Sequence, residues 1–245
     1  MLSSDVLQML TTPANVPVIA YSGARHIQRS VLRVDYVTDE HAARKLLPEP
    51  LQLPLIPRAS VFFTQFFESH GDTPLLEVTQ SIEAVSPAGV TGDYIQAVYT
   101  DNVTSIIHNR EAYLQPILYG VGSLVHRDGA SNFSLTVSDT VVVQGSAGYR
   151  SEPMFIDDAV TFLQRPKFFL KVLGRPALGE PAKPTLFLLR SSQVDVSQAY
   201  KVPARLTLSG HIMAPFDQLP IRHIGSCHSF ESTWSIGEAE AIHRY

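Results

Sequence analysis

Stretches in which apolar and polar residues alternate recur along this 245-residue chain and constrain its fold more than any other feature. Three clear examples are residues 93–100, 134–143 and 204–211. A period of two turns one face of a strand toward a core and the other toward solvent, as in antiparallel sheets. Turn-forming residues separate the runs at 86–89, 127–129 and 174–181. The pattern predicts an α+β fold with a large antiparallel sheet that is curled or barrel-like.

Helical signals are few and short. We expect helices over residues 6–10, 41–47 and 159–164, each preceded by an aspartate and followed by a proline. An aspartate favours the first turn of a helix, whereas proline ends one because it lacks an N–H and clashes with the preceding turn. Because no repeat, low-complexity tract or linker divides the sequence, we expect one domain spanning 1–245.

The composition excludes several classes of function. Hydrophobic residues make up 44% of the chain and charged residues 17%, which supports a sizeable core. The net charge of −4 comes without a Lys/Arg block, so we expect no nucleic-acid partner. The N-terminus lacks signal-peptide features, and no apolar stretch is long enough to span a bilayer. We therefore expect a cytoplasmic globular protein without a membrane partner.

One small cluster invites comparison with a metal site. His223, Cys227 and His228 lie close together, and Cys227 is the only cysteine, which excludes an intrachain disulfide. On a strand, residues 223 and 227 would face one side and 228 the other, so the three cannot converge locally. The common nucleophile, phosphate-loop and dinucleotide motifs are missing as well. We expect neither a metal nor another cofactor.

Several segments in order carry a family resemblance. They are Pro48-Glu49-Pro50-Leu51, Gly92-Asp93-Tyr94, Arg110-Glu111, Arg165-Pro166 with Leu170-Lys171, and the segment 211–220, which contains Met213-Ala214-Pro215. In this order and spacing, from about Leu2 to the C-terminus, the chain resembles acetoacetate decarboxylase and its superfamily. The resemblance implies a cone-like β-barrel with packed sheet and helices, an enclosed apolar pocket that takes a small-molecule substrate, and a homo-oligomer.

The resemblance also implies a chemistry that this chain cannot perform at the usual place. In the family, a lysine amine condenses with a ketone, and the resulting imine cation accepts the electrons released as carbon dioxide leaves. In the family, this lysine and an adjacent second lysine follow soon after an Arg-Glu pair. The matching stretch here is residues 110–120, which puts Ile117 at the Schiff-base position and Leu118 beside it. Neither side chain can form an imine.

No change of alignment restores the missing amine, because the chain has no lysine between Lys45 and Lys167. Lys171 matches a lysine that the family has outside its catalytic role. Lys167 and Lys183 are interpreted as solvated side chains. A lysine relocated into the pocket from elsewhere in the chain stays open as an alternative.

The resemblance assigns further site residues. Arg29 matches a family arginine and Glu77 one of two family glutamates; the second falls near Phe62, and Gln65 on the same segment could supply a neutral polar group. Arg29 would anchor a carboxylate or enolate through its fixed fork of donors. Glu77 would act as a general acid or base with a pKa raised by apolar surroundings. The alternatives are a surface arginine and a structural Arg29–Glu77 pair.

The remaining candidates are weaker. Tyr113, in the segment that lost its lysines, is assigned a catalytic role beside Arg29 and Glu77, and His108 is a further possible donor. The predicted substrate-binding residues are Gln65, Phe62, Ile117, Leu118 and Tyr94.

Three functions follow. The first is a lyase- or cyclase-type enzyme without Schiff-base chemistry, which stabilises an enolate of a β-keto, β-dicarbonyl or polyketide-like compound, in secondary metabolism. The second is a non-catalytic protein that holds a small hydrophobic ligand. The third is a true decarboxylase with a relocated lysine.

Overall fold

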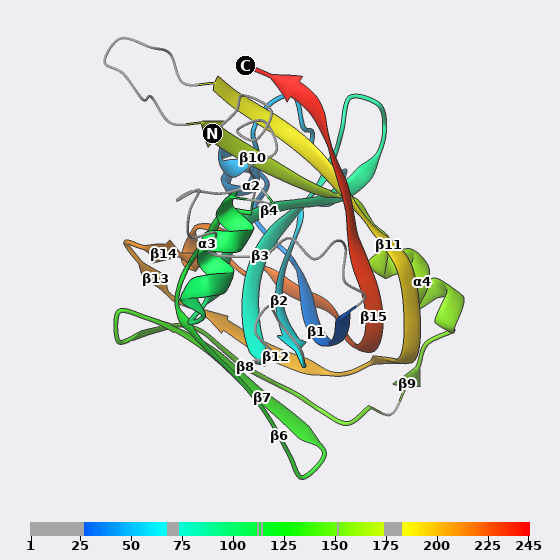
Figure 1. Ribbon diagram of the computed structural model, residues 1–245. Helices are drawn as coiled ribbons and strands as arrows, with labels where there is room; N and C mark the ends of the chain where they lie inside the picture. The colour runs from blue at the N-terminus through cyan, green and yellow to red at the C-terminus, as the bar shows by residue number, and fades with distance from the viewer. Residues whose placement is uncertain (1–26, 68–73, 112, 114, 151, 174–182) are drawn as a thin grey trace, which may run out of the picture.

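The strands of a large mixed sheet form a ring. The computed structural model describes residues 27–67, 74–111, 113, 115–150, 152–173 and 183–245, so the expected helix over 6–10 and the turn at 174–181 lie outside the described residues. The ring consists of β10 (Lys167–Leu173), β11 (Lys183–Lys201), β15 (His223–Arg244), β1 (Ile27–Val37), β2 (Arg58–Phe66), β3 (Leu75–Val85) and β4 (Thr91–Thr100), in that order (Figure 1).

Pairing between β10 and β4 closes this ring of seven strands. That pairing is parallel and joins Lys167 to Asp93 and Phe168 to Tyr94, whereas the other ring neighbours pair antiparallel. The short strand β5 (Ile117–Tyr119) adds to β4 in parallel, and β9 (Glu152–Pro153) pairs with β11. The expected α+β fold with a mainly antiparallel sheet is confirmed, and the sheet closes on itself.

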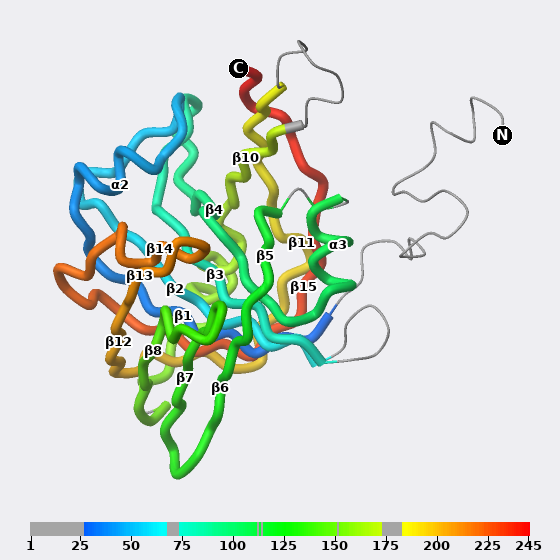
Figure 2. The backbone as a smooth tube through the Cα atoms, turned by 90° about the vertical axis from the view of Figure 1, so that its left-hand side faces the viewer, coloured from blue at the N-terminus to red at the C-terminus, as the bar shows by residue number. Residues whose placement is uncertain are grey.

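A second sheet packs against the outside of the ring. It contains β12 (Ala204–Leu208), β8 (Thr140–Ala147), β7 (Ala130–Val137) and β6 (Val121–Arg127), and it extends below the ring in Figure 2. The main core forms between them, where Val34, Phe63 and Val78 of the ring meet Phe133 and Leu135. Since strand residues alternate between faces, the neighbouring ring residues point to the interior.

One predicted strand is a hairpin. The alternating run over 134–143 crosses a two-residue turn at Ser138 and Asp139, whose φ angles are 47° and 63°. Such left-handed turns suit the twist of paired strands. The expectation of one continuous strand was wrong because the alternation continues in phase across the turn. Farther along, the run 204–211 divides into β12 and β13 (Gly210–His211), which pairs with β14 (Ala214–Pro215).

The helices confirm two of the sequence predictions and add one. The predicted helix over 41–47 is α2 (Glu40–Leu46), whose N-cap Asp39 accepts a hydrogen bond from the Ala42 N–H at 3.0 Å. The predicted helix over 159–164 is α4 (Ile156–Leu163), and η1 (Phe216–Gln218) is a single 3-10 turn. The third, α3 (Val103–Glu111), was not predicted. No helix among the described residues is long and apolar enough to cross a membrane.

Replacing Gly92 with alanine is expected to destabilise the protein by about 1–3 kcal/mol, because the added Cβ has no room at the ring closure. That Cβ would lie 2.4 Å from the Pro166 carbonyl oxygen and 2.8 Å from the Phe168 ring. Urea unfolding would measure the change. The control is Gly225→Ala, whose Cβ comes no nearer than 3.3 Å to another residue; equal losses in both variants would contradict the steric explanation.

Candidate active site

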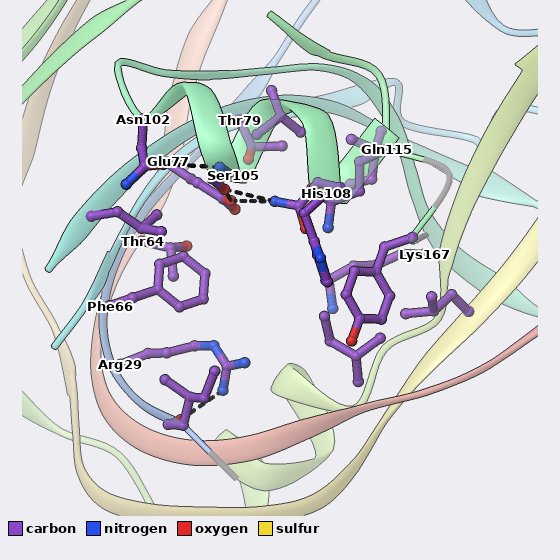
Figure 3. A pocket seen from close by; sticks show the side chains of 18 of the residues that line it. Arg29, Thr64, Phe66, Glu77, Thr79, Asn102, Ser105, His108, Gln115 and Lys167 are labelled. Atoms are coloured by element: carbon purple, nitrogen blue, oxygen red, sulfur yellow. Dashed lines mark hydrogen bonds between the residues drawn. The ribbon is translucent and has the colours of Figure 1, made fainter. Parts of the chain in front are cut away.

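A pocket of about 120 Å³ lies inside the ring, at the end covered by α3 (Figure 3). All seven ring strands contribute to its lining, as does α3 with the segment that follows it. Most of the wall is apolar, and its aromatic side chains include Phe66, Phe169 and Trp234. An arginine, a glutamate and a lysine interrupt this wall, and each comes from a different strand.

Arg29 on β1 is the first of these, and it is held rigidly. Its side chain is 1% exposed, and Nη1 donates to the carbonyl oxygens of Ile27 at 2.7 Å and Trp234 at 2.6 Å. The guanidinium also lies 3.6 Å from the centroid of the Trp234 ring. Burial lowers the pKa of Arg29 to about 9, and nearby Glu77 partly offsets this effect. Nε is buried without an acceptor among the described residues.

Glu77 on β3 is the second group, and it titrates near neutrality. Burial raises its pKa to about 7, although Arg29, Ser105 and Asn109 oppose the shift. Oε1 accepts hydrogen bonds from Asn109 Nδ2 at 3.0 Å and from Ser105 Oγ at 3.4 Å. Among the described residues, no salt bridge joins Glu77 to Arg29. Both residues therefore line the pocket, and the alternative of a closed Arg29–Glu77 pair is not what the structure contains.

Lys167, the first residue of β10, is the third group, and its position corrects the expectation of a solvated side chain. The amine lies 3.3 Å from Ser191 Oγ and 5.1 Å from the centroid of the Trp234 ring. Burial lowers its pKa to about 8; Asp93 opposes this shift, and nearby arginines add to it. The side chain turns inward because residues 167 and 169 share the interior face of the strand.

A buried charge network, which we define as Arg33, Asp35, Asp93, Ser60 and His228, lies deeper in the ring. Arg33 holds both oxygens of Asp93, with Nη1–Oδ2 at 2.6 Å and Nη2–Oδ1 at 2.9 Å. Its Nε donates to Asp35 Oδ1 at 2.7 Å, and Asp35 also accepts from Ser60. Burial alone would raise the pKa of Asp93 and of Asp35, but Arg33 keeps both below their usual range.

Five residues predicted to bind substrate do not line this pocket. Gln65 projects from the opposite face of β2, where it donates to the Leu75 carbonyl oxygen at 3.0 Å; its neighbour Thr64 lines the pocket instead. Tyr94 and Leu118 pack in the main core. Ile117 is fully buried in one cluster with the wall residues Ile95, Val98 and Phe169, and Phe62 packs against the same cluster. Ile117 pairs in register with Val98 on β4, so it packs against the wall residues without itself lining the pocket, and its effect on the polarity of the pocket stays a prediction.

Tyr113 and His108 do reach the pocket. Their ring centroids lie 5.0 Å apart, so the two side chains form one aromatic border on the α3 side. Sequence reasoning missed Ser105 and Asn109, which position Glu77, and Trp234, the only tryptophan in the chain. Asn102 could have revealed this helix, because its Oδ1 caps α3 by accepting from the Ser105 N–H at 2.9 Å.

The suspected His–Cys cluster is dispersed, as strand geometry predicts. Cys227 packs in the main core, whereas His228 Nδ1 lies 3.3 Å from Asp35 Oδ2 in the buried charge network. Within the described part of the chain, no group of three His, Cys, Asp or Glu residues could hold a metal ion.

The comparisons with known proteins agree over the whole chain. The family model for acetoacetate decarboxylase (ADC) matches residues 11–245. Acetoacetate decarboxylase of Clostridium beijerinckii is 30% identical over 251 residues, covering 100% of this chain and 98% of that protein. A solved structure of acetoacetate decarboxylase has a TM-score of 0.93 at 27% identity, covering 100% of this chain and 99% of the other.

A more distant likeness concerns the fold alone. The enduracididine biosynthesis enzyme MppR, solved in complex with pyruvate, has a TM-score of 0.69 at 19% identity, covering 90% of this chain and 91% of that chain.

Buried ionisable groups with shifted pKa values in a mostly apolar pocket are typical of an enzyme that acts on a small molecule. The fold and the pocket of this chain have the features of that class of enzyme. By its sequence and its structure, the chain belongs to the acetoacetate decarboxylase family.

Proposed function

We propose that the protein is a lyase-type enzyme that acts at the carbon next to the carbonyl group of a compact β-keto or related oxo acid. The observation that carries this proposal is that Arg29 and Glu77 line one apolar pocket from different strands. Arg29 binds the anionic oxygen of the substrate or of its enolate. Glu77, with a pKa of about 7, removes and returns the proton at the reacting carbon.

The pocket volume supports a small substrate. At about 120 Å³, the cavity is somewhat smaller than the ~150 Å³ engineered cavity that accommodates benzene. A compact oxo acid such as acetoacetate or pyruvate matches this size better than a polyketide-like compound. The binding of pyruvate by MppR, which shares the fold, supports pyruvate as a second probe.

The structure changes the balance between the mechanisms. The sequence alone places no lysine in the pocket, and this favours a route without a covalent intermediate. Lys167 lines the pocket, which removes the reason for that preference and favours an amine mechanism. A cytoplasmic location, a homo-oligomer, a single domain over 1–245 and a role in secondary metabolism stay predictions from the sequence.

Incubation with acetoacetate or pyruvate in deuterium oxide tests the function. We expect carbon dioxide release from acetoacetate, and deuterium exchange next to the carbonyl of both probes. Arg29→Met should lower kcat/KM by about 10²-fold, since it removes the anion anchor. The exposed Arg205→Met is the control and should match the wild type. Saturable binding of the probes without exchange or carbon dioxide release would instead indicate a ligand-binding protein.

A further inference from the structure

We infer that Lys167 is the reactive amine of this pocket and forms an imine with the substrate carbonyl, while Arg33 keeps that amine free by holding Asp93. The inference rests on the proposed function and deepens it by assigning a catalytic and a positioning residue. Neither residue lies in the segment 110–120, where the family resemblance places the lysine.

The position of Lys167 is the first observation behind this inference. Of the lysines in the described ranges, Lys167 alone lines the pocket, and it shares that pocket with Arg29 and Glu77 (Figure 3). Its identified hydrogen-bond partner is Ser191 Oγ, a neutral group at a long 3.3 Å. The ring of Trp234 borders both the amine and the Arg29 guanidinium. A carbonyl compound held by Arg29 would therefore lie in the same pocket as the amine.

The electrostatic surroundings of Lys167 favour its neutral amine. An amine attacks a carbonyl carbon only when it is neutral, and desolvation together with neighbouring cations favours the neutral form. Burial in the ring lowers the pKa of Lys167 to about 8. The charged groups around it are Asp93 from β4, Arg29 and Arg33 from β1, Arg165 before β10, and Glu77 from β3.

Asp93 is the group that would cancel this effect. It pairs in register with Lys167 and is 2% exposed, so an unpaired Asp93 would attract the proton of the amine. Arg33 prevents this by binding both carboxylate oxygens, and Arg165 Nη2 lies 3.8 Å from Oδ1. Among the described residues, no salt bridge includes Lys167. Arg33 thus has the role of a positioning residue that acts through Asp93.

The steps balance without a further reactant. The neutral amine of Lys167 forms a C–N bond with the carbonyl carbon. The oxygen leaves as water with one amine hydrogen and one solvent proton, and the protonated imine stays behind. With a β-keto acid, the bond to the carboxylate breaks, carbon dioxide leaves, and the electron pair moves to the imine nitrogen. The Glu77 carboxyl protonates the resulting enamine carbon, and water hydrolyses the imine.

Reductive trapping tests the role of Lys167. Borohydride added with acetoacetate or pyruvate should attach a reduced adduct to the wild type, and peptide mapping should locate it at Lys167. Lys167→Met should lose the adduct and at least about 10³-fold of the decarboxylation rate. Lys171→Met, on the same strand, should keep both. An adduct that maps elsewhere, or that persists in Lys167→Met, would overturn the assignment.

The pH dependence of trapping tests the role of Arg33. In Arg33→Gln, Asp93 loses its partner, and the pH of half-maximal trapping should rise by about one unit or more. In Arg33→Gln/Asp93→Asn the negative charge is also gone, so the midpoint should return toward that of the wild type. This double variant buries no unpaired Asp93 charge, which keeps the comparison informative if the single variant folds poorly. An unchanged midpoint in Arg33→Gln, or a raised one in the double variant, would refute the role of Arg33.

Deuterium exchange and borohydride trapping distinguish a failure of the amine mechanism from a failure of the proposed function. If neither probe gives an adduct while the wild type still exchanges deuterium, the amine mechanism is wrong and the proposed function stands. If both exchange and trapping are absent, neither proposal survives.

Discussion

Replacement of Glu77 by glutamine is expected to lower the rate of deuterium exchange next to the carbonyl by about 10²- to 10⁴-fold, because the group that transfers the proton is lost. The fold should survive, since an amide oxygen can still accept from Asn109 Nδ2 and Ser105 Oγ as Oε1 does. Glu83→Gln is the matched control: it lies on the same strand, outside the pocket, and should retain the wild-type rate. Undiminished exchange in Glu77→Gln would remove Glu77 from the mechanism.

The pH profile gives a second result for the same variant. Proton removal needs the carboxylate, so the wild-type exchange rate should rise with pH through about 7, and this rise should be missing in Glu77→Gln. Stability has the opposite sign. Because folding raises the pKa from 4.5 to about 7, the folded wild type retains its proton longer than the unfolded chain does. It should therefore lose up to about 3 kcal/mol of stability as pH rises through this window, and the variant should not.

Arg33→Met is expected to destabilise the protein by about 3–5 kcal/mol at pH 8, which is the usual cost of removing one partner of a buried ion pair. Arg33 is 7% exposed and is bound to Asp93 and Asp35, so the variant leaves two carboxylates without their cation. Urea unfolding would measure the loss. Asp35 keeps its contacts with Ser60 and His228, so most of the damage should come from Asp93.

The sign of the pH dependence separates this explanation from a simple packing defect. In the wild type, Arg33 holds the pKa of both aspartates below 3.8, so their contribution to stability is present above that pH and is lost in acid. In Arg33→Met, burial should raise both pKa values, and stability should fall as pH rises from 5 to 8. The double variant Arg33→Met/Asp93→Asn should recover much of the loss at pH 8. A loss that is equal at pH 5 and pH 8 in Arg33→Met would indicate packing alone.

The parts of the fold that the sequence predicts are those set by neighbouring residues. Period-two alternation identified strands such as β4, and Asp39 marked the start of α2 because its side chain acts locally. The turn at Ser138 and Asp139 escaped because it keeps the alternation in phase. Closure of the ring escaped because β4 and β10 are far apart in sequence and pair in parallel through two residues each.

The site was predictable only where the family resemblance reached. It identified Arg29 and Glu77, and both lie in the pocket. It could not identify Lys167, because the family-like pair Arg165-Pro166 before it is not matched to a catalytic lysine. The inward direction of Lys167 depends on how β10 meets β4, which is a long-range property. The sequence shows that the lysine is missing at Ile117, but only the structure shows that Ile117 packs against the wall residues Val98 and Phe169.

The closure of the ring has a consequence for the evolution of the site. Lys167 and Phe168 are the β10 residues that pair with β4, so the amine is attached to the strand that completes the ring. The strands on both sides of this joint face a common interior, so inward-facing side chains of either strand project into the same space. In the mechanism inferred for Lys167, the reacting amine has moved from the segment 110–120 to β10, while the ring and its pocket are kept.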